Sequence, residues 1–244
     1  MTPTQEGSIR LFRAAGINVF IHWSWFFVAF WIIDNRVGAY SSPMWNVLEY
    51  LGLFLIVLMH EFGHSLATRQ VGGESDTIVL WPFGGVAYVR APERPGANLW
   101  SIAAGPLVNV VLVGVLFLID SLLGSFLWQS YPDAARLLRI LSYINIWILL
   151  FNMLPVYPLD GGQILRSLLW YPLGRIKSLK IATVIGFVGV AGLAGYALYR
   201  QSIWMGVMTA FIFMNCRQGW RRARALGELE AMPNRKDLAC PECH

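Results

Sequence analysis

Leu58-Met59-His60-Glu61-Phe62-Gly63-His64 places three ionisable side chains inside an otherwise apolar run from about Trp45 to Thr68. Ionisable residues are costly within a bilayer, and those that occur there usually have a function. Residues four apart share one face of an α-helix, so His60 and His64 can bind one metal ion. With Glu61 beside the first histidine, this is the H-E-x-x-H pattern, in which two histidines bind zinc and the glutamate is the general base. The alternative is a histidine pair that only forms hydrogen bonds between helices.

The whole chain has the composition of a membrane protein. Of its 244 residues, 56% are hydrophobic and 14% are charged, whereas about 25% are charged in a typical soluble domain. At about 20 apolar residues per span, this length allows one membrane domain of about six spans and little else. The net charge of +5 does not indicate nucleic acid as a partner, because Lys and Arg gather between and after the apolar runs. Three cysteines, two of them at the extreme C-terminus, do not make a disulfide framework.

The pattern of apolar runs predicts an all-α polytopic membrane protein with about six transmembrane helices. A short β-hairpin or edge strand is expected between the second and third helices, where residues 71–97 are rich in Gly, Pro and β-forming residues. We expect residues 1–217 to form the membrane domain, with a catalytic core at about 45–165, and residues 218–244 to form a basic cytoplasmic tail. The predicted spans are 17–33, 45–68, 99–119, 137–154, 181–198 and 203–214.

The distribution of positive charge predicts the orientation. With the N-terminus inside, 15 of the 19 Lys and Arg residues lie at inner ends of the predicted spans and four at outer ends. Cytoplasmic segments carry an excess of Lys and Arg, so both termini should be cytoplasmic, in the cell (inner) membrane. His64 precedes Arg69 by roughly 7–8 Å along the helix, and His60 by roughly 13 Å. The histidine pair should therefore lie toward the cytoplasmic side.

A zinc hydrolase needs a third protein ligand and keeps one coordination position for water. Asp160 is the best candidate, in Asn152-Met153-Leu154-Pro155-Val156-Tyr157-Pro158-Leu159-Asp160-Gly161-Gly162. This segment follows the fourth span, which runs in the same direction as the second, so Asp160 should lie at the depth of the histidines. Irregular backbone at membrane depth is tolerated only where it is buried in protein or lines a cavity. The alternative is that Asp160 is an ordinary turn residue or a helix N-cap.

These motifs together resemble the site-2 protease family of intramembrane zinc metalloproteases. Besides the two segments quoted above, the resemblance is supported by Ala104-Gly105-Pro106-Leu107-Val108-Asn109 and Trp81-Pro82-Phe83-Gly84-Gly85-Val86. It is greatest to the compact sporulation-factor-processing type, which lacks a PDZ insertion. The resemblance implies one Zn²⁺ held by His60, His64 and Asp160, with Glu61 as the catalytic glutamate. It also implies cleavage of a partner's transmembrane segment, as in regulated intramembrane proteolysis.

Further residues are candidates for catalysis and substrate binding. Asn152 could donate a hydrogen bond to the developing oxyanion, or it could form an interhelical hydrogen bond. The β-prone segment 77–89 could pair with an unwound substrate by β-augmentation, or it could be a hairpin that only caps the site. Asn109 has the same two alternatives as Asn152, an oxyanion donor or an interhelical hydrogen bond, and for Asn109 the structural hydrogen bond is favoured. The predicted substrate-binding residues are Phe83, Gly84, Gly85, Asn109, Pro155 and Pro158.

Two polar features are not explained by this site. His22 is either a further polar group near the site or, flanked by tryptophans, an interfacial anchor. The chain ends Cys240-Pro241-Glu242-Cys243-His244, which is formally a haem-attachment pattern, half of a zinc knuckle, or an unstructured tail.

The expected partners are a transmembrane protein substrate and the lipid bilayer, with either a regulatory membrane partner or a second copy of the chain. Two other functions use the same residues: an intramembrane metal transporter, and a catalytically silent relative that binds membrane segments without cutting them. Neither substrate nor activating signal can be identified from the sequence.

Overall fold

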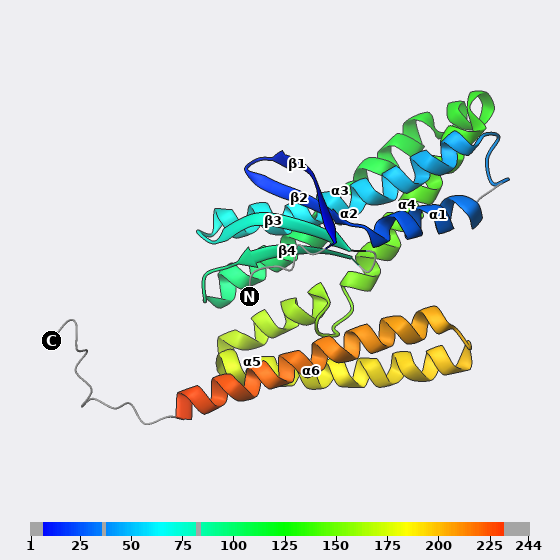
Figure 1. Cartoon of the computed structure of the whole chain (residues 1–244). Coiled ribbons are helices and arrows are strands. Elements are labelled where there is room, and N and C mark those ends of the chain that lie inside the picture. The colour runs from blue at the N-terminus through cyan, green and yellow to red at the C-terminus, as the bar shows by residue number, and fades with distance from the viewer. Residues whose placement is uncertain (1–6, 36–37, 82–83, 232–244) are drawn as a thin grey trace.

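The computed structural model describes residues 7–35, 38–81 and 84–231, and over these residues the chain forms six helices and one four-stranded sheet (Figure 1). The predicted helical fold, with strands between the second and third predicted spans, is confirmed. The helices are α1 (Ser24–Asn35), α2 (Pro43–Gln70), α3 (Pro95–Ser130), α4 (Pro132–Asn152), α5 (Asp160–Tyr199) and α6 (Ile203–Ala231). The strands are β1 (Ser8–Ala14), β2 (Ile17–His22), β3 (Glu74–Trp81) and β4 (Gly84–Arg90).

Among the described residues, α2, α3, α4 and α5 are long and apolar enough to cross a membrane. Helices α2, α3 and α4 each begin with proline. Proline suits the first turn of a helix because the backbone N–H that it lacks would have no hydrogen-bond partner within the helix at that position. Helix α1 has 12 residues and rises about 18 Å, less than the roughly 30 Å of the hydrocarbon core. Helix α6 has 29 residues and continues well past the predicted end at Met214, so it includes the basic segment assigned to the tail.

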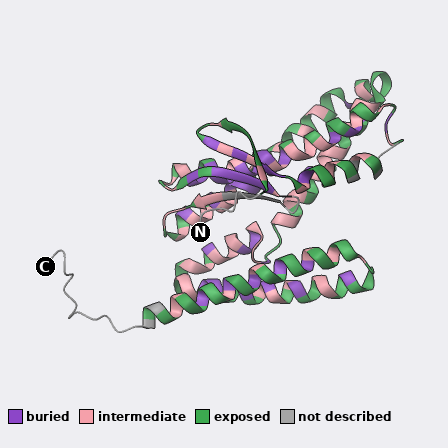
Figure 2. Ribbon diagram, in the orientation of Figure 1, coloured by how far each residue is buried: buried purple, intermediate pink, exposed green. Residues whose placement is uncertain are grey.

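Burial follows the pattern of a protein surrounded by lipid (Figure 2). In an apolar 18-residue stretch of α4, only 11% of the stretch is buried inside the protein. The corresponding share in α2 is 44%. The outward side chains of α3 and α4 are large and apolar, as at Phe117, Leu122 and Trp147. Outward apolar residues on helices of this length identify a multi-pass membrane protein.

The predicted first span, residues 17–33, differs from the structure at its N-terminal half. Ile17, Val19 and Ile21 alternate along strand β2 and are all buried, as period-two side chains on one face of a strand must be. They pack with Leu58 of α2 in one apolar cluster. A strand and a short helix therefore replace the single span, because two adjacent apolar segments with different periods form one continuous run in the sequence.

The four strands lie in chain order in the sheet. Strands β1 and β2 are antiparallel, β2 and β3 are parallel, and β3 and β4 are antiparallel. Strand β4 is therefore an edge strand, with Gly84 paired to Trp81 and Gly85 to Leu80. The predicted hairpin is confirmed, and β1 and β2 extend it into a sheet that packs on α2.

The helices form two layers (Figure 1). Helices α2, α3 and α4 pack on one another, and α5 and α6 form a hairpin in the second layer. Helix α5 is kinked at Gly174, where φ is 78° and ψ is 171°, a backbone conformation that glycine adopts readily. The loop between α4 and α5, residues 153–159, packs on the hairpin through Val156, which shares an apolar cluster with Val190 and Ile212.

Candidate metal centre

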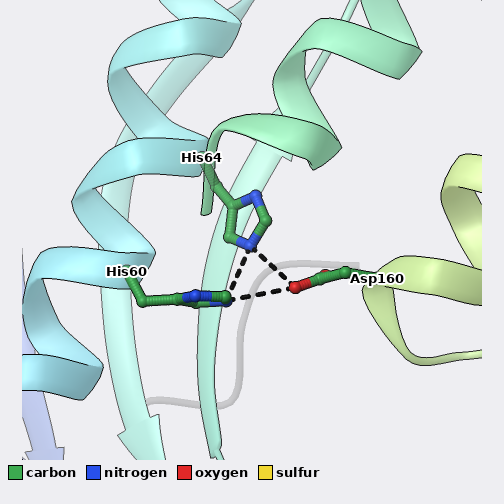
Figure 3. A group of neighbouring side chains, drawn as sticks. All are labelled: His60, His64 and Asp160. Atoms are coloured by element: carbon green, nitrogen blue, oxygen red, sulfur yellow. Dashed lines mark hydrogen bonds and ion pairs between the residues drawn. The ribbon is translucent and has the colours of Figure 1, made fainter. Parts of the chain in front are cut away.

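Three side chains from two helices converge at one point inside the membrane-spanning region (Figure 3). Nε2 of His60 lies 3.1 Å from Nε2 of His64 and 3.1 Å from Oδ2 of Asp160. Nε2 of His64 lies 3.5 Å from the same carboxylate oxygen. Both histidines are on α2, and Asp160 is the first residue of α5. The two motifs, almost 100 residues apart in the sequence, thus form one cluster.

The far side of each imidazole is held by an oxygen atom. Nδ1 of His64 lies 2.9 Å from the backbone oxygen of Ser101, which can only accept a hydrogen bond. Nδ1 of His60 lies 2.5 Å from Oδ1 of Asn109. Each Nδ1 therefore carries the proton and donates it, and each Nε2 presents a lone pair to the centre. Metal-binding histidines are usually oriented in this way.

The chemistry of this donor set fits a cation. Two imidazole lone pairs and one carboxylate meet at the centre, and Oδ2 of Asp160 is buried with no hydrogen-bond donor among the described residues. Three electron-rich atoms at this separation repel one another unless a positive charge lies between them. In a tetrahedral zinc site, ligand atoms about 2.0–2.1 Å from the metal lie about 3.3 Å apart. The measured separations of 3.1–3.5 Å match that spacing.

Room for His64 depends on Gly105 in α3. A methyl group added at Gly105 would overlap the imidazole of His64, with Nε2 as its nearest atom. Any larger residue would therefore push the ring away from the centre. The need for space beside His64 explains why residue 105 is glycine. From the sequence alone, the segment Ala104–Asn109 served only to support the family resemblance.

Glu61 follows His60 on α2 and is 6% exposed. A carboxylate at this depth is retained where it is paired or has a chemical task. Its place in the helix, next to one histidine and three residues before the other, is the place of the general base in the H-E-x-x-H pattern.

Most of the remaining predicted residues lie on α4, in the loop after it and on strand β4, apart from those outside the described part of the chain. Asn152 is the last residue of α4, half-buried, and its side chain makes no hydrogen bond within the described part of the chain. Pro155 is exposed, and the backbone oxygen of Pro158 accepts a hydrogen bond from Gln163. Gly84 and Gly85 lie in the edge strand β4. Phe83, Cys240, Cys243 and His244 lie outside the described residues.

Two polar residues have structural contacts. Asn109 is fully buried, and its amide contacts His60 and Asn145, so it links α3 to the cluster and to α4. The ring of His22 stacks on Trp81 with 3.9 Å between centroids, and its Nδ1 lies 2.5 Å from the hydroxyl of Ser24. His22 is therefore not in the cluster of His60, His64 and Asp160.

Comparison with known proteins places the chain in a family. A family model described as Peptidase family M50 matches residues 49–131 and 127–195, which include all three cluster residues. The chain belongs to peptidase family M50. The predicted resemblance to site-2 proteases is thereby confirmed.

Several relatives of this M50 chain are named as zinc metalloproteases or putative zinc metalloproteases. A zinc metalloprotease of Methanocaldococcus jannaschii is 34% identical over 211 residues, covering 86% of this chain and 60% of the relative. Stage IV sporulation protein FB of Bacillus subtilis is 28% identical over 188 residues, covering 75% of this chain and 60% of the relative. The M50 chain thus spans about 60% of the length of each of these two curated relatives.

A solved structure has the same fold. The M50 chain resembles the site-2 protease from Methanocaldococcus jannaschii with a TM-score of 0.61 and 29% identity, over 87% of this chain and 95% of that one. The likeness extends over nearly the whole of that structure, so the helices and sheet described above form a shared architecture.

Proposed function

We propose that this M50 chain is an intramembrane zinc metalloprotease that hydrolyses peptide bonds in or near transmembrane segments of partner proteins. The observation that carries the proposal is the convergence of His60, His64 and Asp160 within helices that span the bilayer, beside a buried glutamate. Membership of family M50 and the names of the relatives support it. One Zn²⁺ is the proposed cofactor.

Zinc held by His60, His64 and Asp160 would supply Lewis acidity and lower the pKa of a bound water toward 7. Glu61 accepts a proton from the attacking water and later donates a proton to the leaving amine. Ser101 and Asn109 keep the two imidazoles in the tautomer whose Nε2 lone pairs point to the centre. The amide of Asn152, which has no partner within the described chain, is the proposed donor to the developing oxyanion.

The edge strand β4 is the proposed platform for the substrate. A helical substrate hides its peptide bonds, so it must be unwound before water can attack them. An edge strand offers unpaired backbone groups to an extended chain, and main-chain hydrogen bonds then hold the unwound segment. Phe83, Gly84 and Gly85, at and before the start of β4, are the proposed contacts, together with Pro155 and Pro158.

The excess of Lys and Arg at one set of helix ends supports a proposed orientation with both termini in the cytoplasm. The active site would then lie toward the cytoplasmic side of the cell membrane. A transmembrane protein substrate is the proposed partner, and a regulatory membrane protein or a second copy of the chain would control access.

Substitution of Glu61 tests the activity. Membrane vesicles from cells that lack the chain would be fused with liposomes containing the purified wild-type chain or Glu61→Gln, and new N-termini within transmembrane segments would be counted by mass spectrometry. We expect cleavage to fall by at least about 100-fold in Glu61→Gln, as for loss of a general base, with zinc retained. Glu93→Gln, which alters a surface ion pair with Arg175, is the matched control and should cleave normally.

Two results would contradict the proposal. The same new termini at undiminished rate from Glu61→Gln would exclude this mechanism. A wild-type chain that binds zinc and yields no new termini would favour the catalytically silent relative.

A further inference from the structure

Helix α4 supplies no residue to the metal cluster, yet it buries one asparagine. Most of α4 faces outward, and its only two buried residues are Ala135 and Asn145. Asn145 is fully inaccessible. An amide placed in the interior of a membrane protein needs partners for its donors and its acceptor, because no water is available to satisfy them.

The partner of Asn145 is Asn109 on α3, through two hydrogen bonds. Nδ2 of Asn145 donates to the backbone oxygen of Asn109 at 3.0 Å. Nδ2 of Asn109 donates to Oδ1 of Asn145 at 2.7 Å. The remaining atom of the Asn109 amide, Oδ1, lies 2.5 Å from Nδ1 of His60. The chain of contacts therefore runs from α4 through α3 to a histidine of the cluster on α2.

The donor and acceptor of each hydrogen bond between Asn145, Asn109 and His60 follow from the chemistry of one atom. The backbone oxygen of Asn109 can only accept, so the atom of Asn145 that faces it must be the NH₂ group. The other atom of Asn145 is then the carbonyl oxygen, which requires the NH₂ group of Asn109 to face it. Oδ1 of Asn109 is left to face His60, and His60 must place its proton on Nδ1.

We propose that Asn145 is a positioning residue that selects the zinc-binding tautomer of His60 by preventing the amide of Asn109 from rotating. Without Asn145, a half-turn of that amide would present NH₂ to Nδ1 of His60. The imidazole would then accept at Nδ1 and carry its proton on Nε2, where no lone pair would remain for the metal. This inference rests on the proposed zinc site and assigns a role in it to α4.

The test measures zinc affinity of the purified full-length chain in detergent micelles, by competition with a chromophoric chelator. Outer partners of metal-bound histidines typically contribute 10–100-fold to affinity, so Asn145→Leu should weaken zinc binding by at least about tenfold. Asn145→Ala should do the same without the bulk of leucine. Ser142→Ala on the same helix, which removes a hydroxyl that among the described residues bonds only to the backbone oxygen of Leu138, should bind zinc as the wild type does.

A second background separates tautomer selection from packing. In Asn109→Asp, either carboxylate oxygen accepts the proton of Nδ1, so rotation of the group no longer matters. Asn145→Leu should then not weaken zinc binding in the Asn109→Asp background, although it weakens binding in the wild-type background. A residue that only filled space would weaken zinc binding equally in both.

Zinc affinity of Asn145→Leu and Asn145→Ala equal to that of the wild type would overturn the inference, as would an equal loss in both backgrounds. Circular dichroism of the zinc-free variants confirms that they are folded. The outcome is independent of peptidase activity: a wild-type chain that binds zinc but cleaves nothing would end the proposed function and leave this inference testable.

Discussion

At the scale of single residues, the proposed metal centre depends on atoms that are not among its proposed ligands. His64 is oriented by the backbone oxygen of Ser101 and has space only because residue 105 is glycine. His60 is oriented by Asn109, which is held by Asn145. Each of these groups determines where an imidazole lone pair points. Substituting one of them should therefore reduce metal affinity more than it reduces the stability of the fold.

Gly105→Ala tests the space around His64. The added methyl group would overlap the imidazole, so the ring must rotate and lose its hydrogen bond to Ser101. We expect zinc affinity to fall by about 10–100-fold, measured by chelator competition. Gly114→Ala on the same helix is the matched control, because, apart from the adjacent backbone of its own helix, no described residue lies within 4 Å of the position its methyl group would occupy. Equal zinc affinity in the two variants would contradict the geometry.

His60, Glu61 and His64 could be singled out from the sequence because their signal is local, whereas Asp160 required the predicted topology and the family resemblance. Ionisable groups in an apolar run are conspicuous, and helical spacing then defines the face. Asn145 could not, since a lone asparagine in a predicted span has no local pattern that names its partner. Ser101 acts through its backbone oxygen, which every residue type has. These contributions depend on how the helices pack.

At the scale of elements, the loop that carries Asp160 is fixed by the α5–α6 hairpin. The thiol of Cys216 on α6 donates to the backbone oxygen of Tyr157 at 2.8 Å. Val156 packs into the hairpin with Val190 and Ile212. The position of Asp160, three residues after Tyr157, is therefore set from the second layer, while both histidines are set from the first.

Gly186→Ala tests this anchoring. Its methyl group would lie 2.8 Å from Sγ of Cys216 and 2.9 Å from the backbone oxygen of Tyr157, so the loop must shift and take Asp160 with it. We expect zinc affinity to fall by roughly tenfold, at the lower end of outer-partner effects. Gly192→Ala, on the same helix, should have no effect, because its methyl group would meet no described residue beyond the adjacent backbone of its own helix. An equal loss of zinc affinity in both variants would show that a methyl group anywhere on α5 disturbs the site, and it would contradict anchoring through the loop.

One element type and several element boundaries were not predicted from the sequence. Strand β2 and helix α1 form one apolar run, so the strand was hidden in a predicted span. Helix α6 continues to Ala231 because Arg, Ala, Leu and Glu, which dominate its last turns, all favour helix outside the apolar region as well. The hairpin was predicted correctly because its glycines and prolines interrupt the apolar pattern.

At the scale of the whole molecule, the cluster joins the two layers of helices, which also contact each other through α3 and α5. Zinc bound by α2 and α5 would tie the α2–α4 layer to the α5–α6 hairpin. A ligand that binds only the folded state stabilises it by about 4 kcal/mol when its free concentration is 1,000 times Kd. Zinc should therefore contribute to stability as well as to chemistry.

Removal of the metal tests this link. Chelation should lower the Tm of the wild-type chain by roughly 10 °C, because each kcal/mol corresponds to about 2–4 °C in a protein of this size. Asp160→Ala should show little further change on chelation, measured by differential scanning fluorimetry in detergent. Glu74→Gln, at an exposed ion pair with Arg90, should respond as the wild type does. An equal effect of chelation on the wild type and Asp160→Ala would contradict the role of Asp160 as a ligand.

The most direct measurement is zinc K-edge X-ray absorption on the purified full-length chain loaded with one zinc per chain. We predict a first shell of nitrogen and oxygen at about 2.0–2.1 Å, with the multiple scattering of two imidazoles. Asp160→Ala should lose one oxygen neighbour or the metal itself. A shell containing sulfur at about 2.3 Å would place the zinc on cysteine, and a wild-type chain that retains no zinc would leave the site without its metal; either result would contradict the account.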